Sequence, residues 1–349
     1  MTIAYYVSGH GFGHASRSIE LMAAIQAKRP DVRVVMLTSV APWFVERSRK
    51  SGFDVQPCQT DTGIVQIDSL RIDEDATAAA ATSFYATFAD RVDVEAARLR
   101  SIGASLVIGD VPPLAFAAAA AAGVPAIAVA NFTWDWIYGG YPDFEKNAPG
   151  VSALVSACYA RASLALRLPL HGGFGPMAPV TRDIPFIARR SSKTKADVRS
   201  HLGIDPHRTV VVASFGAYGA DLPLRDIEAA NDVTLLGDDS LQGLRYEDLV
   251  AAADVVVTKP GYGIVSECVA NGAALLYTSR GRFVEYDMFV DEMPRYLRCR
   301  HIPQEDLKAG RWGEAIRAVL AQPPPPPAPV NGAEVSAGLV LDVIGSVRS

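Results

Sequence analysis

The chain has 349 residues, of which 49% are hydrophobic and 20% charged, and a formal net charge of −5. The length is about twice that of a typical single domain and the composition is globular, which predicts two domains and excludes a disordered chain. The acidic balance, without a large Lys/Arg cluster, argues against a nucleic-acid-binding surface.

The first apolar run, at residues 3–7, follows the initiator methionine almost directly, without a basic leader or cleavage site, so no signal peptide is expected. The alanine-rich run at residues 115–122 is too short to span a membrane, and a Gly-Val-Pro sequence at 123–125 ends it. The four cysteines lack the spacing of a metal site or of a disulfide framework. These features predict a cytoplasmic protein without a transmembrane segment.

Apolar, β-branched runs alternate with helical patterns in the first half of the chain. Strands are predicted at residues 3–7, 32–37, 106–108 and 126–129. Their continuous hydrophobicity indicates burial on both faces, as in a parallel sheet. The stretch 16–28 is predicted to be a crossover helix, because it begins with the N-cap candidate Ser16 and carries an apolar stripe.

The amino-acid composition changes after residue 168. Glycines, prolines and a basic segment that contains Arg189 predict a solvated domain linker there. A second, shorter α/β series follows. Its strands are predicted at residues 209–214, 233–236, 254–257 and 274–277. The proline run at 323–327 predicts a stiff spacer, and the apolar spacing at 332–347 predicts a closing helix that lies back on the first domain. The predicted segments are 1–168, 169–192 (linker), 193–322, 323–331 (spacer) and 332–349.

The first segment that carries chemistry is the Gly-His-Gly-Phe-Gly-His sequence at residues 9–14, between the first strand and its helix. Gly11 and Gly13 allow a ligand to approach the backbone closely, and the following helix N-terminus favours an anion. The sequence departs from the dinucleotide fingerprint GxGxxG, since His14 stands where its last glycine would be. Two imidazoles, His10 and His14, at the carboxyl edge of a sheet are better placed for base catalysis than for a core role.

Asp110 comes directly after the predicted strand at 106–108 and Gly109. A carboxylate at this edge could accept a hydrogen bond from an imidazole of the first loop, fixing its tautomer and raising its basicity. The alternative is that Asp110 caps the helix that starts near Pro112. The residues alone leave both roles open.

The second domain contains another strand, glycine turn and helix, at residues 258–267. Gly261, Gly263 and the helix N-terminus could hold a diphosphate, while Glu267 could bind two ribose hydroxyls. Glu267 could instead be an ordinary exposed helix residue. The combination of the glycine turn with Ser266 and Glu267 favours ligand binding.

A polar, acidic loop at residues 279–287 follows the next predicted strand. Glu285, Tyr286 or Asp287 could bind sugar hydroxyls, although an acid-rich helix N-terminus explains the same residues. The Asp-Glu-Asp sequence at 73–75 spells DxD, the cation-binding sequence of another transferase fold. It lies in a predicted polar loop after no clear strand and is expected to face solvent.

Aromatic residues cluster around Asp135, after the predicted strand at 126–129. They are Phe132, Trp134, Trp136, Tyr138 and Tyr141. They could form a wall that binds an acceptor, but such clusters more often belong to a core or an interface.

Together these segments resemble the GT-B glycosyltransferases, especially the branch of the peptidoglycan N-acetylglucosaminyltransferase and the plant glucosyltransferases. The resemblance implies an α/β fold in which two Rossmann-like domains present parallel sheets to an interdomain cleft. In the plant enzymes the histidine of a Gly-His pair, matched by Gly13 and His14, activates the acceptor, and an aspartate matched by Asp110 supports it. The loop at residues 214–217 looks like the phosphate-facing loop of the second domain, and Ala217 is part of it.

The residues and the resemblance together give a set of predicted donor-binding residues and a set of predicted acceptor-binding residues. The donor-binding residues are Gly11, Gly13, Ser214, Phe215, Gly216, Gly261, Tyr262, Gly263, Ser266, Glu267, Glu285, Tyr286 and Asp287. The acceptor-binding residues are His10, Arg17, Trp134 and Asp135.

A second resemblance covers nearly the whole chain and is to the N-terminal, glycosyltransferase-like region of plant L-arabinokinases. It is carried by residues 6–17, 131–135, 259–267, 311–312 and 331–334. The glycine-serine phosphate loop of the kinase portion has no counterpart in this sequence, so kinase activity is not implied. The sequence departs from the GT-B pattern where Glu285-Tyr286-Asp287 replaces the usual two-residue acidic or glutamine pair for the donor sugar.

The GT-B resemblance implies an inverting, metal-independent hexosyl- or pentosyltransferase that uses a nucleoside-diphosphate sugar, specifically a UDP-sugar, and no other cofactor. His14 would deprotonate an acceptor hydroxyl, and the second-domain helix N-terminus would stabilise the departing diphosphate in place of a cation. The expected partners are a small-molecule donor and an acceptor that the residues do not identify. A homodimer is left open.

Two other functions remain open from the sequence. The Gly-His-Ala-Ser-Arg sequence at residues 13–17 also resembles the GHxxR sequence of a GT-B-like enzyme that cleaves UDP from a pseudaminic-acid precursor. In a UDP-sugar hydrolase of that kind, His14 would activate water. The third alternative is a non-catalytic module that binds nucleotide sugars.

Overall fold

The computed structural model describes residues 1–216 and 222–346, so Ala217 of the predicted phosphate-facing loop lies outside the described residues. The chain divides into two compact units. Unit 1 consists of Met1–Gln66, Ile72–Ile187 and Asn331–Ser349, and unit 2 consists of Ile67–Arg71 and Ala188–Val330.

Unit 1 is built on a seven-stranded sheet in the order β3-β2-β1-β6-β7-β8-β9, in which paired strands run parallel. The strands are β1 (Thr2–Val7), β2 (Arg33–Thr38), β3 (Asp54–Pro57), β6 (Ala104–Asp110), β7 (Ala126–Ala130), β8 (Leu164–Arg167) and β9 (Thr181–Asp183). The strand order reverses between β1 and β6, where Val7 pairs with Asp110. In open α/β sheets, ligands bind outside the carboxyl ends of the strands at such a reversal.

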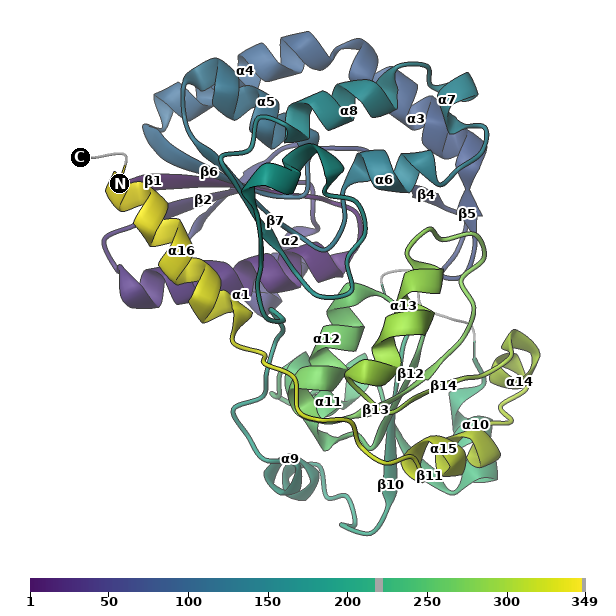
Figure 1. Ribbon diagram of the computed structural model, residues 1–349. Helices are drawn as coiled ribbons and strands as arrows, with labels where there is room; N and C mark the ends of the chain where they lie inside the picture. Colours follow the sequence, from purple (N-terminus) through teal and green to yellow (C-terminus); the bar gives the residue numbers. More distant parts are fainter. Residues whose placement is uncertain (217–221, 347–349) are drawn as a thin grey trace. The chain divides into compact units, whose positions relative to one another are not determined.

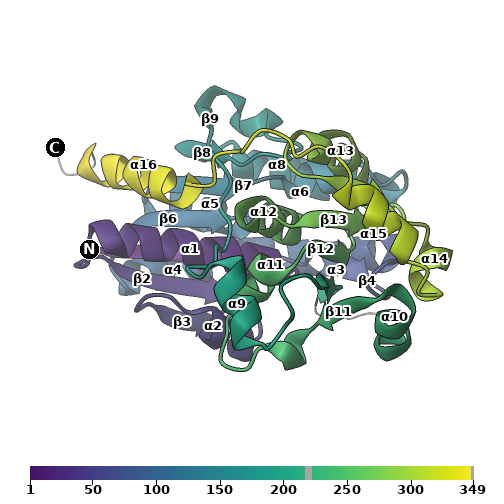
Figure 2. The same cartoon turned by 90° about the horizontal axis from the view of Figure 1, so that it is seen from below.

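Helices cover both faces of this sheet. They are α1 (Phe12–Lys28), α2 (Pro42–Ser48), α3 (Glu74–Ala86), α4 (Phe88–Ser101), α5 (Pro113–Ala122), α6 (Trp134–Gly139), α7 (Phe144–Asn147), α8 (Val151–Tyr159) and α16 (Gly332–Ser346). Figure 1 shows α1, α2 and α16 on one face and α4, α5 and α8 on the other. The C-terminal helix α16 packs along α1, so the end of the chain completes the first unit (Figure 2).

Helix α1 begins at Phe12 rather than at Ser16, so the predicted N-cap is wrong. Gly11, with φ of 78°, is the N-cap, and a residue without a side chain adopts this left-handed backbone readily. The Ser16 hydroxyl lies inside the helix and donates to the Phe12 carbonyl over 2.9 Å. The earlier start places His14 within the helix instead of in the loop before it.

Two other short segments differ from the sequence prediction. Strand β9 lies inside the stretch that was predicted to be a linker, and it adds an edge strand to the unit 1 sheet by pairing with β8. A hairpin of β4 (Val65–Gln66) and β5 (Ile72–Asp73) precedes α3. Asp73 caps α3 by accepting a hydrogen bond from the Ala76 amide over 2.8 Å, so the predicted loop there is wrong, while Asp75 is exposed as expected. A single acidic sequence thus ends a strand and starts a helix.

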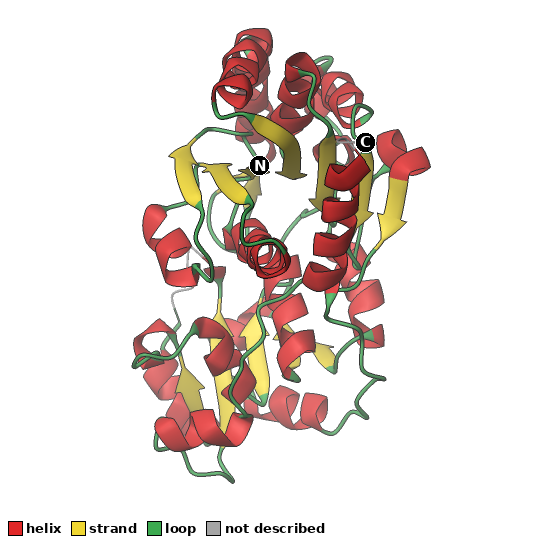
Figure 3. Cartoon of the chain, turned by 90° about the vertical axis from the view of Figure 1, so that its left-hand side faces the viewer, coloured by secondary structure: helices red, strands yellow, loops and turns green. Residues whose placement is uncertain are grey.

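Unit 2 has a parallel five-stranded sheet in the order β11-β10-β12-β13-β14. The strands are β10 (Thr209–Ser214), β11 (Val233–Leu236), β12 (Val255–Thr258), β13 (Ala274–Tyr277) and β14 (Cys299–His301). The helices are α9 (Lys195–His201), α10 (Leu224–Asn231), α11 (Tyr246–Ala252), α12 (Tyr262–Asn271), α13 (Tyr286–Glu292), α14 (Gln304–Lys308) and α15 (Gly313–Leu320). Figure 3 shows strands flanked by helices in both units.

The strand register of unit 2 gathers the candidate donor-binding segments. Ser214 pairs with Thr258 and Thr258 with Tyr277, so the carboxyl ends of β10, β12 and β13 share one edge of the sheet. Behind this edge the fully buried Trp312 fills the core, and its indole nitrogen donates to the Leu307 carbonyl over 2.9 Å. The loops that follow these three strands therefore rest on a packed base.

Candidate functional site

A buried network of polar side chains surrounds Asp110 at the carboxyl end of β6. The Asp110 side chain is fully buried, and its Oδ1 lies 2.9 Å from Nδ1 of His14. Arg17 donates to both carboxylate oxygens, from Nη2 to Oδ1 over 2.6 Å and from Nε to Oδ2 over 2.7 Å. Ser18 donates to Oδ2 over 3.0 Å. The Asp110 carboxylate thus contacts His14, whereas the described helix α5 has Pro112 as its N-cap and no side-chain cap.

The start of α1 explains this convergence. His14, Arg17 and Ser18 stand three and four positions apart, a spacing that places side chains on one helix face. The Ser8 amide donates to the Asp110 carbonyl over 2.9 Å, which holds the end of β1 against the end of β6. The first turns of α1 therefore lie over the reversal in strand order.

The neighbours of Asp110 determine its charge. Burial by itself raises the pKa of this carboxyl group, but the charge of Arg17, its hydrogen bonds and the contact with His14 outweigh burial. The pKa of Asp110 is lowered to about 2. At neutral pH the network therefore contains a carboxylate that Arg17 and His14 share.

Two polar residues of this region were not predicted as site residues. Asn131, directly after β7, accepts a hydrogen bond from Nη1 of Arg17 over 2.6 Å. Asp61, in the loop after β3, accepts from the Ser8 hydroxyl over 3.1 Å and from the Trp134 indole over 2.9 Å, and burial raises its pKa. Both follow strands of the sheet, and this position was the signal that could have identified them.

The aromatic cluster packs against the two imidazoles. The His14 ring meets Phe132 edge to face at 5.4 Å between centroids, and the His10 ring meets Trp134 at 5.6 Å. Trp134 is only 1% exposed, so in this structure it has the core role that the sequence left open, while Asp135 beside it is half-buried. The aromatic rings of the cluster therefore pack against the imidazoles of His10 and His14.

In unit 2 the glycine turn leads into α12, with Gly261 as its N-cap. Ser266 is buried, and its hydroxyl donates to the Gly263 carbonyl over 2.9 Å within the helix. Glu267 is only 2% exposed and accepts a hydrogen bond from Nε of Arg189 over 2.6 Å. Glu267 is therefore neither exposed nor an ordinary surface residue.

Arg189 was predicted to be a solvated linker charge, and this prediction is wrong. Its side chain is mostly buried against Glu267, and its guanidinium lies 5.0 Å from the Tyr246 ring centroid. Burial alone would lower the pKa of Arg189, but the charge of Glu267 outweighs burial and raises it. Arg189 and Glu267 form an ion pair that ties the start of unit 2 to α12.

The loop after β10 is held by neighbouring side chains. The Tyr246 hydroxyl donates to the Ser214 hydroxyl over 2.6 Å, and Ser69 donates to the Phe215 carbonyl over 2.9 Å. Gly216 has a φ of 69°, and a Cβ added there would stand 4.0 Å from Cε of Lys259. The Lys259 side chain therefore reaches the loop after β10.

Lys259 is a further residue that the site prediction missed. It lies between the end of β12 and the glycine turn, and burial, followed by the nearby charge of Arg280, lowers its pKa to about 7. A lysine before a glycine turn was visible in the sequence, but its burial was not. In the next loop, Glu285 is buried, Tyr286 is half-buried at the start of α13 and Asp287 is exposed.

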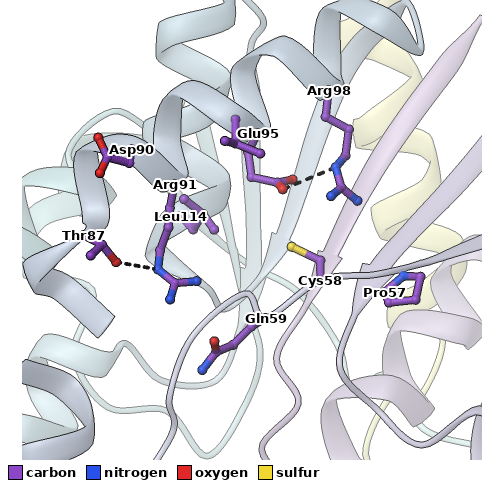
Figure 4. A pocket seen from close by; sticks show the side chains of 10 residues that line it. Pro57, Cys58, Gln59, Thr87, Asp90, Arg91, Glu95, Arg98 and Leu114 are labelled. Carbon is purple, nitrogen blue, oxygen red and sulfur yellow. Dashed lines mark hydrogen bonds and ion pairs between the residues drawn. The ribbon is translucent and has the colours of Figure 1, made fainter. Parts of the chain in front are cut away.

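A separate cavity of about 360 Å³ lies in unit 1 between the end of β3, α4 and the start of α5 (Figure 4). Glu95 on its wall is buried, accepts a hydrogen bond from the Tyr6 hydroxyl over 2.9 Å and pairs with Arg98. Burial and the charge of Glu95 raise the pKa of Cys58 to about 12. The residues that line this cavity are different from the predicted site residues.

Comparison with known proteins identifies the fold. No protein-family model matches the chain. The chain is 30% identical to L-arabinokinase of Arabidopsis thaliana over 98% of its own length and 34% of that protein. It therefore spans about a third of the length of the curated relative that it matches.

Solved glycosyltransferase structures resemble the chain along its whole length. Phytolacca americana UGT2 matches with a TM-score of 0.57 at 12% identity, covering 100% of both chains. The glycosyltransferase SnogD from Streptomyces nogalater matches with a TM-score of 0.58 at 16% identity, covering 98% of this chain and 99% of its own. MurG of Acinetobacter baumannii matches with a TM-score of 0.50 at 12% identity, with the same coverage.

Among the described helices, none combines the length and the apolar character that crossing a membrane requires.

The solved structures share the arrangement of two Rossmann-like domains, and both predicted resemblances are confirmed. The chain is a GT-B protein, with the fold of glycosyltransferases and a sequence related to that of L-arabinokinase.

Proposed function

We propose that the protein is an inverting glycosyltransferase that moves a sugar from a nucleoside-diphosphate sugar, a UDP-sugar, to a hydroxyl group of an acceptor. The observation that carries the proposal is the contact of His14 with Asp110 at the reversal in strand order of a GT-B unit. The similar Phytolacca americana UGT2 was solved in complex with UDP-2fluoro-glucose and pterostilbene, which supports a UDP-sugar as the donor.

His14 would act as the general base of the reaction. With Nδ1 donating its proton to Asp110, Nε2 carries the free electron pair. Nε2 takes the proton of the acceptor hydroxyl while the hydroxyl oxygen bonds to the anomeric carbon. The bond from that carbon to the diphosphate breaks, and its electron pair leaves on the phosphate oxygen. A single displacement inverts the configuration of the anomeric carbon.

Unit 2 would hold the donor. The N-terminus of α12, with its positive end of the helix dipole, would bind the diphosphate and stabilise it as it departs, in place of a metal cation. Glu267, fixed by Arg189, would accept hydrogen bonds from the ribose hydroxyls. Lys259 lies at the same edge and would add a positive charge beside the phosphates.

We expect Glu267→Ala to bind UDP at least about tenfold more weakly than the wild type. Hydrogen bonds to a charged group contribute about 1.5–3 kcal/mol, and about 1.4 kcal/mol corresponds to a factor of ten. Isothermal titration of UDP measures this loss, with Glu305→Ala as the control, since the Glu305 side chain in unit 2 is 87% exposed. Equal UDP affinity in wild type and Glu267→Ala would remove Glu267 from the donor site.

We also expect UDP binding to take up a proton through Lys259. With a pKa of about 7, this amine is largely neutral at pH 8, and a neighbouring diphosphate favours its charged form. Proton uptake near pH 8 should exceed that at pH 6, and Lys259→Met should abolish the difference. Titration in buffers of different ionisation enthalpy measures the uptake, with the exposed Lys308→Met as control. If Lys259→Met took up protons as the wild type does, the amine of Lys259 would lie outside the donor site.

Hydrolysis of the donor is the second candidate function. The GHxxR sequence is present at residues 13–17, and its arginine lies in the Asp110 network. The same imidazole would then activate water instead of an alcohol. Release of UDP at the full catalytic rate without any acceptor would favour this reaction over transfer.

A further inference from the structure

Arg17 occupies a position that the predicted role of an acceptor ligand does not explain. The residue is 3% exposed, and its guanidinium donates to both oxygens of Asp110 over 2.6 and 2.7 Å. Its third nitrogen donates to Asn131 over 2.6 Å, and Asn131 in turn donates to the Leu170 carbonyl over 3.3 Å. The planar guanidinium is therefore fixed by contacts from β6 and from the loop after β7.

We propose that Arg17 is a positioning residue for His14, which neutralises Asp110 and holds the carboxylate oxygen that orients the imidazole. The inference rests on the proposed function for the role of His14 as the base. The Arg17 Nη2 lies 3.1 Å from Nδ1 of His14 and 2.6 Å from the Asp110 oxygen that the imidazole also contacts. The Arg17 guanidinium thus neutralises the Asp110 carboxylate and holds the carboxylate oxygen that contacts His14.

Charged groups reach His14 from three elements of unit 1. Arg17 lies on the same helix, Asp110 ends β6, and Asp61 interacts electrostatically with His14 from the loop after β3. With Arg17 present, the positive guanidinium balances the carboxylate of Asp110, and this pair is neutral without a proton on His14. Without Arg17, the buried carboxylate is stabilised best by an imidazolium.

The sign of the expected effect follows from this charge balance. Removing the cation leaves a negative charge beside the imidazole, which favours its protonated form. The titration midpoint of His14 should therefore move to higher pH in Arg17→Met, by about one pH unit or more. Arg17→Lys keeps the charge but not the planar fork, so its midpoint should stay near that of the wild type. Removing the carboxylate as well, in Arg17→Met/Asp110→Asn, should reverse the shift.

The test is an NMR titration of the His14 imidazole in these variants, with neither donor nor acceptor present. Arg17→Gln is the second neutral variant, because its amide retains hydrogen-bond donors if Arg17→Met fails to fold, and it should show the same upward shift. A midpoint unchanged in the neutral variants would overturn the proposal, as would an upward shift that persists in the double variant.

A kinetic measurement separates positioning from acceptor binding. In the positioning role, Arg17→Lys lowers kcat because one ammonium cannot hold both oxygens of Asp110 and Asn131 together, while the KM of the acceptor changes little. A rise in acceptor KM with kcat unchanged would instead assign Arg17 to the acceptor. The NMR titration needs no turnover, so a protein that transfers no sugar would refute the proposed function and leave this inference to be decided by the titration.

Discussion

Replacing His14 with alanine is expected to slow sugar transfer by a factor of about 10²–10⁴, the usual contribution of a positioned general base. The variant lacks the nitrogen that would take the proton of the acceptor hydroxyl. UDP affinity should be retained, because the proposed donor-binding residues Glu267 and Lys259 belong to unit 2. Initial rates of UDP release with a donor and an acceptor, together with isothermal titration of UDP, measure the two quantities separately.

The matched control is His207→Ala, since His207 is exposed in the loop before β10. It should transfer sugar at the wild-type rate. Unimpaired turnover in His14→Ala would end its assignment as the base. If UDP binding were lost together with turnover, the substitution would have acted through the folding of the protein, and the assignment would need the conservative variant His14→Gln.

Two strands that were predicted correctly, β1 and β12, have side chains that are buried on both faces of a sheet. Strand β1 is buried at every position, and β12 is too, so each appears in the sequence as an unbroken apolar run. Strands β9 and β14 have three residues each with mostly exposed side chains, including Arg182 and Arg300. Edge strands of this kind carry no periodic pattern, and their pairing with a neighbour defines them.

The site was predictable as far as it depends on position along a strand or turn. His14 and Asp110 could be paired because each follows a strand of one parallel sheet, and such ends meet at one edge. Arg189 was misassigned, and the partners of Arg17 could not be predicted, because these partners lie far along the chain, 93 residues away for Asp110 and 78 for Glu267. A charged residue shows its charge in the sequence, whereas its burial against an opposite charge depends on the packing of distant segments.

Replacing Asp110 with alanine is expected to reduce the free energy of unfolding by about 3–5 kcal/mol at neutral pH, the usual cost of breaking a buried ion pair. The substitution leaves the buried guanidinium of Arg17 without the carboxylate that accepts two of its hydrogen bonds. Denaturant unfolding measures the loss. Asp54→Ala is the control, because the Asp54 side chain is 55% exposed in its ion pair with Arg33, and such pairs contribute about 1 kcal/mol or less.

The pH dependence of this difference tests the charge of Asp110. Its pKa is about 2 in the folded protein and 3.8 for the unperturbed group, so the unfolded chain binds the proton more readily. The carboxylate therefore stabilises the fold fully above about pH 5, and this contribution is lost as the pH falls toward 2. The unfolding free energies of wild type and Asp110→Ala should converge over that range. A difference that stays constant down to pH 2 would mean that the Asp110 side chain stabilises the fold by its shape and packing. The negative charge of the carboxylate would then contribute nothing to stability through Arg17.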